Sequence, residues 1–399
     1  MIARVWPVFV IVPALFWPLF AAAQDPSATP LTIGFLAQAT HRQAPQPFLD
    51  PPPADEGLVG ARLAIDDDNT TGRFAGQQFA LAEEVVPEDG DVIGAMRKLL
   101  ARQIRFIVTD LPEATLLAAA DLPEAKVATV FNAGAADDDL RGEKCRANLL
   151  NTLPSRAMLA DALVEYLLVK QWRNIFLVVG PGDGDRAYAA AVRRAVGKFH
   201  ARLVADKPWT YQPGARRSDT GHYAIAAEVA RFTQGVSYDV LVVADEEDAF
   251  GDYLSYATYD PRLVAGTQGL IAAAWARPHQ EWGATQLQDR FLRLAKRWMT
   301  DRDYAGWLAV RAIGEAATRT QSLDPAVIAA YMRGDKFQLG GYKGQALSFR
   351  PWDGQMRQAI LLYQPRALVS VSPQPGFLHQ VSELDTLGID RPETKCRVQ

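Results

Sequence analysis

Two successive series of short β-branched runs, each run followed by a longer helical pattern, constrain the fold of this chain most. The first series covers residues 31–131 and the second covers residues 155–243. Strands that alternate with helices form parallel sheets with helices on both faces. The sequence therefore predicts an α/β fold with two doubly wound, Rossmann-like lobes.

The residues after the second series predict no third lobe. They contain a strand at 270–274 and two helices between 285 and 320. Helices of this length need a sheet to pack on, so we expect the chain to return to lobe 1 and then cross again into lobe 2. Three strands then form the hinge, with crossings near Leu153, Ala274 and Gly340. The predicted units are a signal peptide at 1–23, lobe 1 at 31–153 plus 275–339, lobe 2 at 154–274 plus 340–365, and a C-terminal tail at 366–399.

The first residues have the pattern of a cleavable secretory signal peptide. Arg4 supplies the positive charge, an apolar stretch follows, and the small residues Ala21 to Ala23 precede Gln24. The apolar stretch is shorter than the ~20 residues that span a bilayer, which disfavours a retained membrane anchor. We therefore expect a protein that is exported to the periplasm.

Charge and cysteine content exclude several classes of protein. The chain has 42 Lys and Arg against 46 Asp and Glu, and it has no basic run that could neutralise a phosphate backbone. We expect no nucleic-acid partner. The two cysteines, Cys145 and Cys396, are too few for a four-thiolate zinc site. In an oxidising compartment we expect them to form a disulfide, which would fold the tail after Tyr363 back over lobe 1.

Several segments resemble the type I periplasmic binding proteins of the leucine/isoleucine/valine class. Residues 55–72, with the sequence DEGLVGARLAIDDDNTTG, resemble a helical segment of that class, and residues 106–110 are similar to its third strand. Residues 151–155 and 304–313 are similar to its crossover and a later helix, so the resemblance extends from 31 to 363. Residues 55–72, together with 383–388 and Cys396, look like the subfamily encoded beside PQQ-dependent alcohol dehydrogenase systems.

The resemblance implies a periplasmic binding protein type I fold that closes on a small-molecule or ion ligand and delivers it to an ABC permease in the cytoplasmic membrane. It also implies a monomer without cofactors or catalytic residues. No G-x-S-x-G, H-E-x-x-H or Walker pattern occurs in the sequence, so we expect no enzyme activity. Two alternatives stay open: a ligand sensor for a signalling receptor, and an accessory protein or enzyme of alcohol oxidation.

The loops that follow the predicted strands supply the candidate ligand-binding residues. Ligands of doubly wound sheets lie beyond the carboxyl ends of the strands, and two such edges facing each other make a cleft. The predicted ligand-binding residues are Gln38, Thr40, His41, Asp110, Leu111, Glu113, Asn132 and Ala133 in lobe 1, Asp183, Asp185, Asp245 and Glu246 in lobe 2, and Trp275 near a crossing.

These loops depart from the pattern of the amino-acid binders that the chain resembles. Those proteins hold a carboxylate with Ser or Thr hydroxyls and exposed amides, whereas this chain has Asp110-Leu-Pro-Glu113 and Asn132-Ala-Gly-Ala135. Carboxylates would repel an anionic ligand, so we expect a cation, amine, alcohol or polyol. Each acidic residue has a competing role as a helix cap or solvent-facing group. The sequence does not decide whether a metal binds; oxygen ligands would favour a hard ion such as calcium or a lanthanide.

Overall fold

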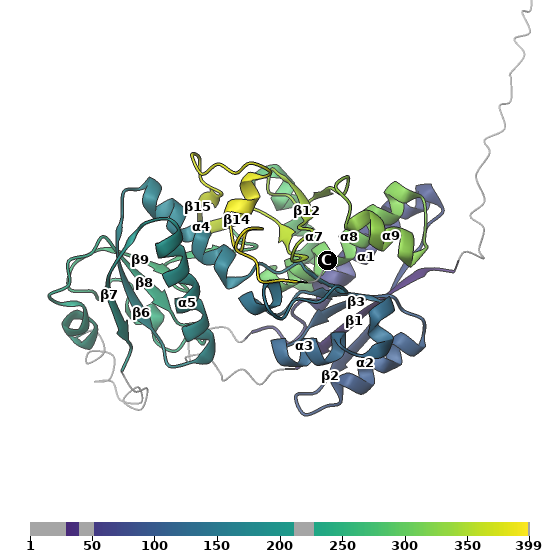
Figure 1. Cartoon of the computed structure of the whole chain (residues 1–399), viewed down its shortest axis with the longest axis horizontal. Helices are drawn as coiled ribbons and strands as arrows, with labels where there is room; N and C mark the ends of the chain where they lie inside the picture. Colours follow the sequence, from purple (N-terminus) through teal and green to yellow (C-terminus); the bar gives the residue numbers. More distant parts are fainter. Residues whose placement is uncertain (1–28, 40–51, 211–226, 398–399) are drawn as a thin grey trace, which may run out of the picture.

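The computed structural model describes residues 29–39, 52–210 and 227–397. Figure 1 shows two α/β lobes beside each other, with the C-terminal segment, in yellow, along their junction. Within the described ranges, no helix combines the length and apolar character needed to cross a membrane.

Lobe 1 is built on a parallel five-stranded sheet in the order β2-β1-β3-β4-β5. Its strands are β1 (Leu31–Gln38), β2 (Phe79–Val86), β3 (Phe106–Asp110), β4 (Thr129–Asn132) and β5 (Leu149–Asn151). Side chains alternate between the two faces, as a pleated strand requires. Ile33 and Phe35 pack on one face with α1 (Leu58–Ala75), whereas Leu36 packs on the other with α2 (Val92–Ala101) and α3 (Glu113–Ala120).

Lobe 2 is built on a seven-stranded sheet in the order β15-β14-β10-β9-β8-β6-β7. The parallel strands are β6 (Asn174–Val179), β7 (Arg202–Pro208), β8 (Val240–Ala244), β9 (Leu263–Gly266) and β10 (Leu270–Ala273). The antiparallel strands are β14 (Ile360–Gln364) and β15 (Ala367–Ser372). Helices α4 (Arg156–Val169) and α5 (Asp183–Lys198) cover one face. This mainly parallel sheet with helices packed on it confirms the predicted α/β fold class.

After β10 the chain returns to lobe 1, where α7 (Ala284–Ala295), α8 (Asp301–Thr320) and α9 (Pro325–Met332) extend its core. A small sheet follows, made of β11 (Leu339–Gly340), β12 (Ala346–Phe349) and β13 (Met356–Arg357). Leu347 and Met356 are fully buried in the core of lobe 1. Because these apolar side chains complete that core, the third crossing lies between β13 and β14, later than the predicted position near Gly340.

Buried polar contacts join the first crossing to the third and fix the second crossing. Gln358 donates from Nε2 to the carbonyl of Thr152 at 2.8 Å, and Lys343 donates from Nζ to Oε1 of Gln358 at 2.9 Å. At the second crossing, the carboxylate of Asp301 accepts hydrogen bonds from the amides of Ala274 at 3.1 Å and Trp275 at 2.8 Å. Each crossing segment is therefore held in place by buried hydrogen bonds in addition to the covalent chain.

The predicted disulfide is confirmed, because Cys145 is bonded to Cys396. The tail that carries Cys396 does not fold back over lobe 1 as expected from the sequence. It adds β15 to the sheet of lobe 2, and Leu387 is fully buried in the lobe 2 core. The amide of Gly388 also donates to Oδ2 of Asp161 in α4 at 2.8 Å. The tail contacts lobe 1 at Asp385, which accepts from Arg350 and Arg357 of the β12–β13 region, and again at the disulfide near its end.

Candidate ligand-binding cleft

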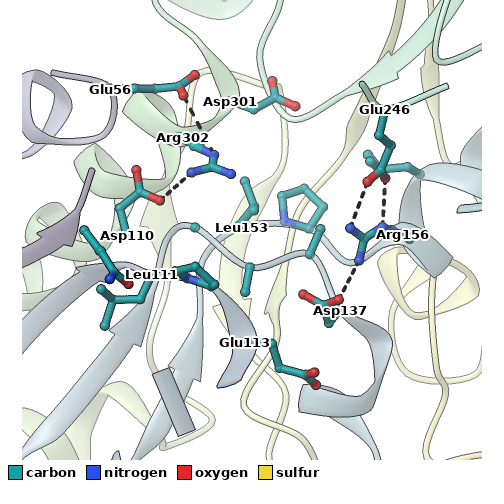
Figure 2. Close-up of a pocket in the computed structure, with 17 residues that line it drawn as sticks. Glu56, Asp110, Leu111, Glu113, Asp137, Leu153, Arg156, Glu246, Asp301 and Arg302 are labelled. Atoms are coloured by element: carbon teal, nitrogen blue, oxygen red, sulfur yellow. Dashed lines mark hydrogen bonds and ion pairs between the residues drawn. The ribbon is translucent and has the colours of Figure 1, made fainter. Parts of the chain in front are cut away.

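The loops at the carboxyl ends of the two sheets enclose a cavity of about 490 Å³ between the lobes. Lobe 1 contributes the ends of β1, β3 and β4 and the start of α8, and lobe 2 contributes the start of α4 and the loop after β8. Figure 2 shows the side chains of these segments directed toward a shared space. The volume is within the range of small-molecule sites, about 300 to 1,000 Å³.

One guanidinium group organises the wall formed by lobe 1. Arg302, in the first turn of α8, donates from Nη1 to Oδ1 of Asp110 at 2.7 Å. Its Nε lies 3.8 Å from a carboxylate oxygen of Glu56 (Figure 2). Farther along the wall, Glu113 begins α3 and accepts from Nζ of Lys144 at 3.1 Å. The cations on this wall are thus paired with carboxylates.

A second guanidinium group joins the two lobes. Arg156, the first residue of α4, donates from Nε to Oε1 of Glu246 at 2.8 Å and from Nη1 to Oδ1 of Asp137 at 2.8 Å (Figure 2). Glu246 follows β8 in lobe 2, whereas Asp137 follows β4 in lobe 1. Burial opposes the charge of Arg156, but the bonds to Glu246 and Asp137 raise the pKa of the guanidinium above its usual range.

The lining of the cavity is strongly acidic. Its described residues include the carboxylates Glu56, Asp110, Glu113, Asp137, Glu246 and Asp301, but only the two guanidinium groups of Arg156 and Arg302. Burial raises the pKa of Asp301 to about 6, although the amides of Trp275 and Ala274 favour its charged form. None of the described lining residues is Ser or Thr. An anion would therefore meet carboxylates and already paired arginines.

No group of three or more His, Cys, Asp or Glu residues that could hold a metal ion occurs among the residues described. The carboxylates of the cleft instead face Arg302, Arg156 and Lys144. The geometry of this part of the chain gives no support to the calcium or lanthanide ion considered from the sequence.

The structure brings some of the predicted site residues together and separates others. The predicted residues that line the cavity are Gln38, Asp110, Leu111, Glu113 and Glu246. The predicted residues that do not line it are Asn132, Ala133, Asp183, Asp185, Asp245 and Trp275. Thr40 and His41 lie outside the described residues.

Three of the predicted aspartates serve the backbone or face solvent. Asp245 is fully buried and accepts from the amides of Ala249 at 2.9 Å, Phe250 at 2.8 Å and Gly251 at 2.6 Å. Burial raises the pKa of Asp185, whose carboxylate accepts from the amides of Gly182 and Glu246. The side chain of Asp183 is 97% exposed on the surface of α5. Asp245 and Asp185 thus satisfy backbone amides of turns and helix starts, as capping aspartates do, whereas Asp183 faces solvent.

The other three residues that miss the cavity belong to the interior of lobe 1. The amide of Asn132 donates to Oδ1 of Asn151 at 2.9 Å, and Ala133 is fully buried. Trp275 stacks on Tyr304 with ring centroids 4.8 Å apart and donates from Nε1 to Gln288 at 2.8 Å. Trp275 is therefore a packed aromatic residue in this arrangement.

Several residues of the cleft are not among those predicted from the sequence, chiefly Glu56, Asp137, Arg156, Asp301 and Arg302. Two signals could have located some of them. Ser155 caps α4 by accepting from the amide of Met158, and Thr300 caps α8 by accepting from the amide of Asp303. The first of these helices, α4, begins directly after the crossing predicted near Leu153, and α8 lies in the segment that follows the crossing predicted near Ala274, so the residues beside these caps were candidates for the cleft.

Comparison with known proteins gives structural matches only. No protein-family model matches the chain, and no curated protein matches it. A branched-chain amino acid ABC transporter periplasmic ligand-binding protein from Burkholderia xenovorans matches with a TM-score of 0.66 and 17% identity, over 86% of this chain and 95% of that one. The chain has the fold of a type I periplasmic binding protein.

Two further structures with this fold extend the comparison. A periplasmic binding protein from Burkholderia mallei matches with a TM-score of 0.63 and 14% identity, over 92% of this chain and 99% of that one. The second is the branched-chain amino acid transporter substrate-binding protein LivJ of Streptococcus pneumoniae in complex with isoleucine. It matches with a TM-score of 0.60 and 14% identity, over 86% of this chain and 99% of that one. At these identities the type I binding-protein fold is what is shared.

Proposed function

We propose that this chain is the exported solute-binding component of an ABC importer and that it binds a small solute in the interlobe cleft. The observation that carries the proposal is the cavity of about 490 Å³, whose lining comes from both lobes of a type I binding-protein fold. A ligand held by both walls stabilises the closed arrangement of the lobes, because it contacts both walls only when they approach each other. A permease can then distinguish loaded from empty protein.

The charges of the cleft support a cationic or neutral solute, with a small amine as the preferred class. The six carboxylates outnumber the two guanidinium groups, and both Arg156 and Arg302 are already paired. The carboxylate of a free amino acid would have no Ser or Thr hydroxyl to accept from on the described lining. This ligand class differs from the isoleucine held by the pneumococcal protein.

We further propose that the importer serves PQQ-dependent alcohol oxidation. Residues 55–72, the tail at 383–388 and Cys396 carry the resemblance to that subfamily, and Cys396 is bonded to Cys145. Deleting the gene should slow growth on a short alcohol as carbon source and leave growth on a sugar unchanged. Equal growth of the deletion and parent strains on alcohol would contradict this association.

Titration calorimetry of ligand-free protein tests the binding function. The probes are putrescine, ethanol, leucine and calcium or lanthanide chloride. We expect putrescine to bind and its affinity to fall about tenfold or more in Asp110→Asn and Glu246→Gln, since each removes a charge from the cleft. Asp183→Asn is the matched control, because this exposed carboxylate lies outside the cavity. Micromolar binding of leucine that is unchanged in the two cleft variants would overturn the proposed ligand class.

A further inference from the structure

A second cavity, of about 630 Å³, also lies between the lobes and shares no lining residue with the cleft. Lobe 1 provides its wall through the segment that follows β10 and through α7, including Arg277, His279 and Gln288. Lobe 2 provides Pro365 and Arg366 from the turn between β14 and β15. A ligand that spans this cavity therefore contacts both lobes.

Two buried side chains of this cavity have a polar atom without a partner. His279 is 1% exposed, and its Nε2 lies 2.7 Å from the carbonyl of Tyr342. Since a carbonyl only accepts, Nε2 carries the hydrogen and Nδ1 is an acceptor. Gln288 is 4% exposed, and its Oε1 accepts from Trp275, which leaves Nε2 as a donor. Neither His279 Nδ1 nor Gln288 Nε2 has a hydrogen-bonding partner within the described chain.

The unpaired acceptor of His279 and the unpaired donor of Gln288 both belong to side chains that contact Trp275. A buried polar group without a partner costs about 1 to 3 kcal/mol, and Trp275 contacts both side chains, with the ring of His279 at 5.6 Å. Each of the two atoms exposes less than 1 Å² in this arrangement, so a ligand reaches it only when the side chain turns toward the cavity. A hydroxyl group that reaches both atoms satisfies both requirements, because it donates one hydrogen and accepts on its lone pairs. The unpaired acceptor of His279 and the unpaired donor of Gln288 thus favour a ligand that carries a hydroxyl group.

The rim of the cavity has the opposite charge to the cleft. The guanidinium of Arg277 lies over the ring of Trp298 at 3.9 Å, so its face is covered and its in-plane N–H groups are directed outward. Arg366 is exposed on its turn. In the described ranges no ion pair joins Arg277 or Arg366 to Asp289, the carboxylate of this lining. Two guanidinium groups on opposite lobes suit two carboxylates on one ligand.

We propose that this cavity binds a small hydroxylated dicarboxylate. One carboxylate pairs with Arg277 of lobe 1 and the other with Arg366 of lobe 2, and the hydroxyl donates to His279 and accepts from Gln288. The ligand stabilises the interlobe arrangement in which both arginines reach it. This site does not depend on the cationic ligand proposed for the cleft.

Calorimetric titration of the mature protein with L-malate and succinate tests the site. We expect malate to bind, and succinate, which lacks the hydroxyl, to bind about tenfold more weakly because His279 and Gln288 then stay unpaired. Arg277→Gln and Arg366→Gln should each weaken malate binding about tenfold or more. Arg293→Gln is the matched control, since Arg293 is an exposed arginine of α7 outside this cavity.

A cleft variant separates this site from the proposed function. Malate binding should be unchanged in Arg302→Gln, which alters the cleft only. Loss of malate binding in Arg302→Gln would place the anion in the cleft and overturn the proposal. Absence of malate binding up to about 10 mM, unchanged binding in the Arg277 and Arg366 variants, or equal affinity for malate and succinate would overturn it as well.

Discussion

Cys396 is bonded to Cys145 across 251 residues of sequence, although the segment that precedes Cys396 is packed on lobe 2. Cys145 lies in lobe 1, in the loop before β5. Asp385 anchors the same segment, because it accepts from Nε of Arg350 and Nε of Arg357, each at 2.8 Å. The tail is therefore a fourth connection between the lobes, and it is covalent.

Replacing both cysteines should destabilise the protein. In the chain-entropy account, the loop closed by this disulfide contributes about 5 kcal/mol to the free energy of unfolding. We expect Cys145→Ser/Cys396→Ser to lose up to this amount in urea unfolding and to expose residues near Lys395 to proteolysis. Because Arg350 holds Asp385 and Leu387 is buried in the lobe 2 core, cleavage should stop short of both residues. Unchanged unfolding and protease resistance would contradict a stabilising role.

Removal of Arg156 should weaken the contact between the lobes. Arg156→Ala leaves Asp137 and Glu246 without the guanidinium that both bond at 2.8 Å. The side chain is only 13% exposed, so we expect a loss of about 1 to 2 kcal/mol in the free energy of unfolding. The control is Arg186→Ala, which breaks an exposed pair with Asp183 and should leave the unfolding curve unchanged. Equal effects of the two substitutions on the free energy of unfolding would show that the Arg156 contacts between the lobes contribute no more than an exposed ion pair.

Glu165 should make stability fall as the pH rises. This carboxyl is fully buried in α4, and burial raises its pKa from 4.5 to about 7. The folded state then binds more protons than the unfolded state, so stability is highest below pH 4.5 and is lost as the pH rises toward about 7. Glu165→Gln should be more stable than the parent above this range, by about 2 to 3 kcal/mol.

The difference between Glu165→Gln and the parent should vanish near pH 4, where the carboxyl is protonated in both states. Thermal or urea unfolding at several pH values measures it. Glu143→Gln, at an exposed glutamate paired with Lys395, is the control and should lack this pH dependence. If Glu165→Gln and the parent differed in stability by the same amount at all pH values, the raised pKa of Glu165 would not be the cause of the pH dependence.

Two glycine-to-alanine substitutions should have opposite effects. At Gly60, on α1, an added Cβ would lie 1.8 Å from the carbonyl oxygen of Asp303 on α8, so the two helices would have to separate. We expect Gly60→Ala to cost about 3 kcal/mol. At Gly197, on α5, a Cβ meets nothing within 4 Å, and Gly197→Ala should stabilise by about 0.5 to 1 kcal/mol. Similar unfolding midpoints for the two variants would contradict the close packing of α1 on α8.

The predicted ligand-binding residues that line the cavity lie where strand ends determine their position. Asp110 and Glu246 directly follow or end buried parallel strands and line the cleft. Asp245 precedes Glu246 in the same loop, but its carboxylate turns inward to three backbone amides. The sequence does not distinguish these neighbours, because either carboxylate could cap the turn. Arg302 was missed because its position depends on the docking of α8 against α1, which no local pattern encodes.

The sequence by itself determined the layers of this protein. The repeated pattern of strand and helix encodes which side chains are buried, and this property depends on residues a few positions apart. It was sufficient for the α/β class, and the export signal with only two cysteines in the sequence was sufficient for the disulfide. Only the tertiary structure decided the place of the third crossing and the docking of the tail on lobe 2. It also decided which acidic residues face the cleft, because the partners of Arg156, Asp385 and Asp245 come from segments that meet only in the folded chain.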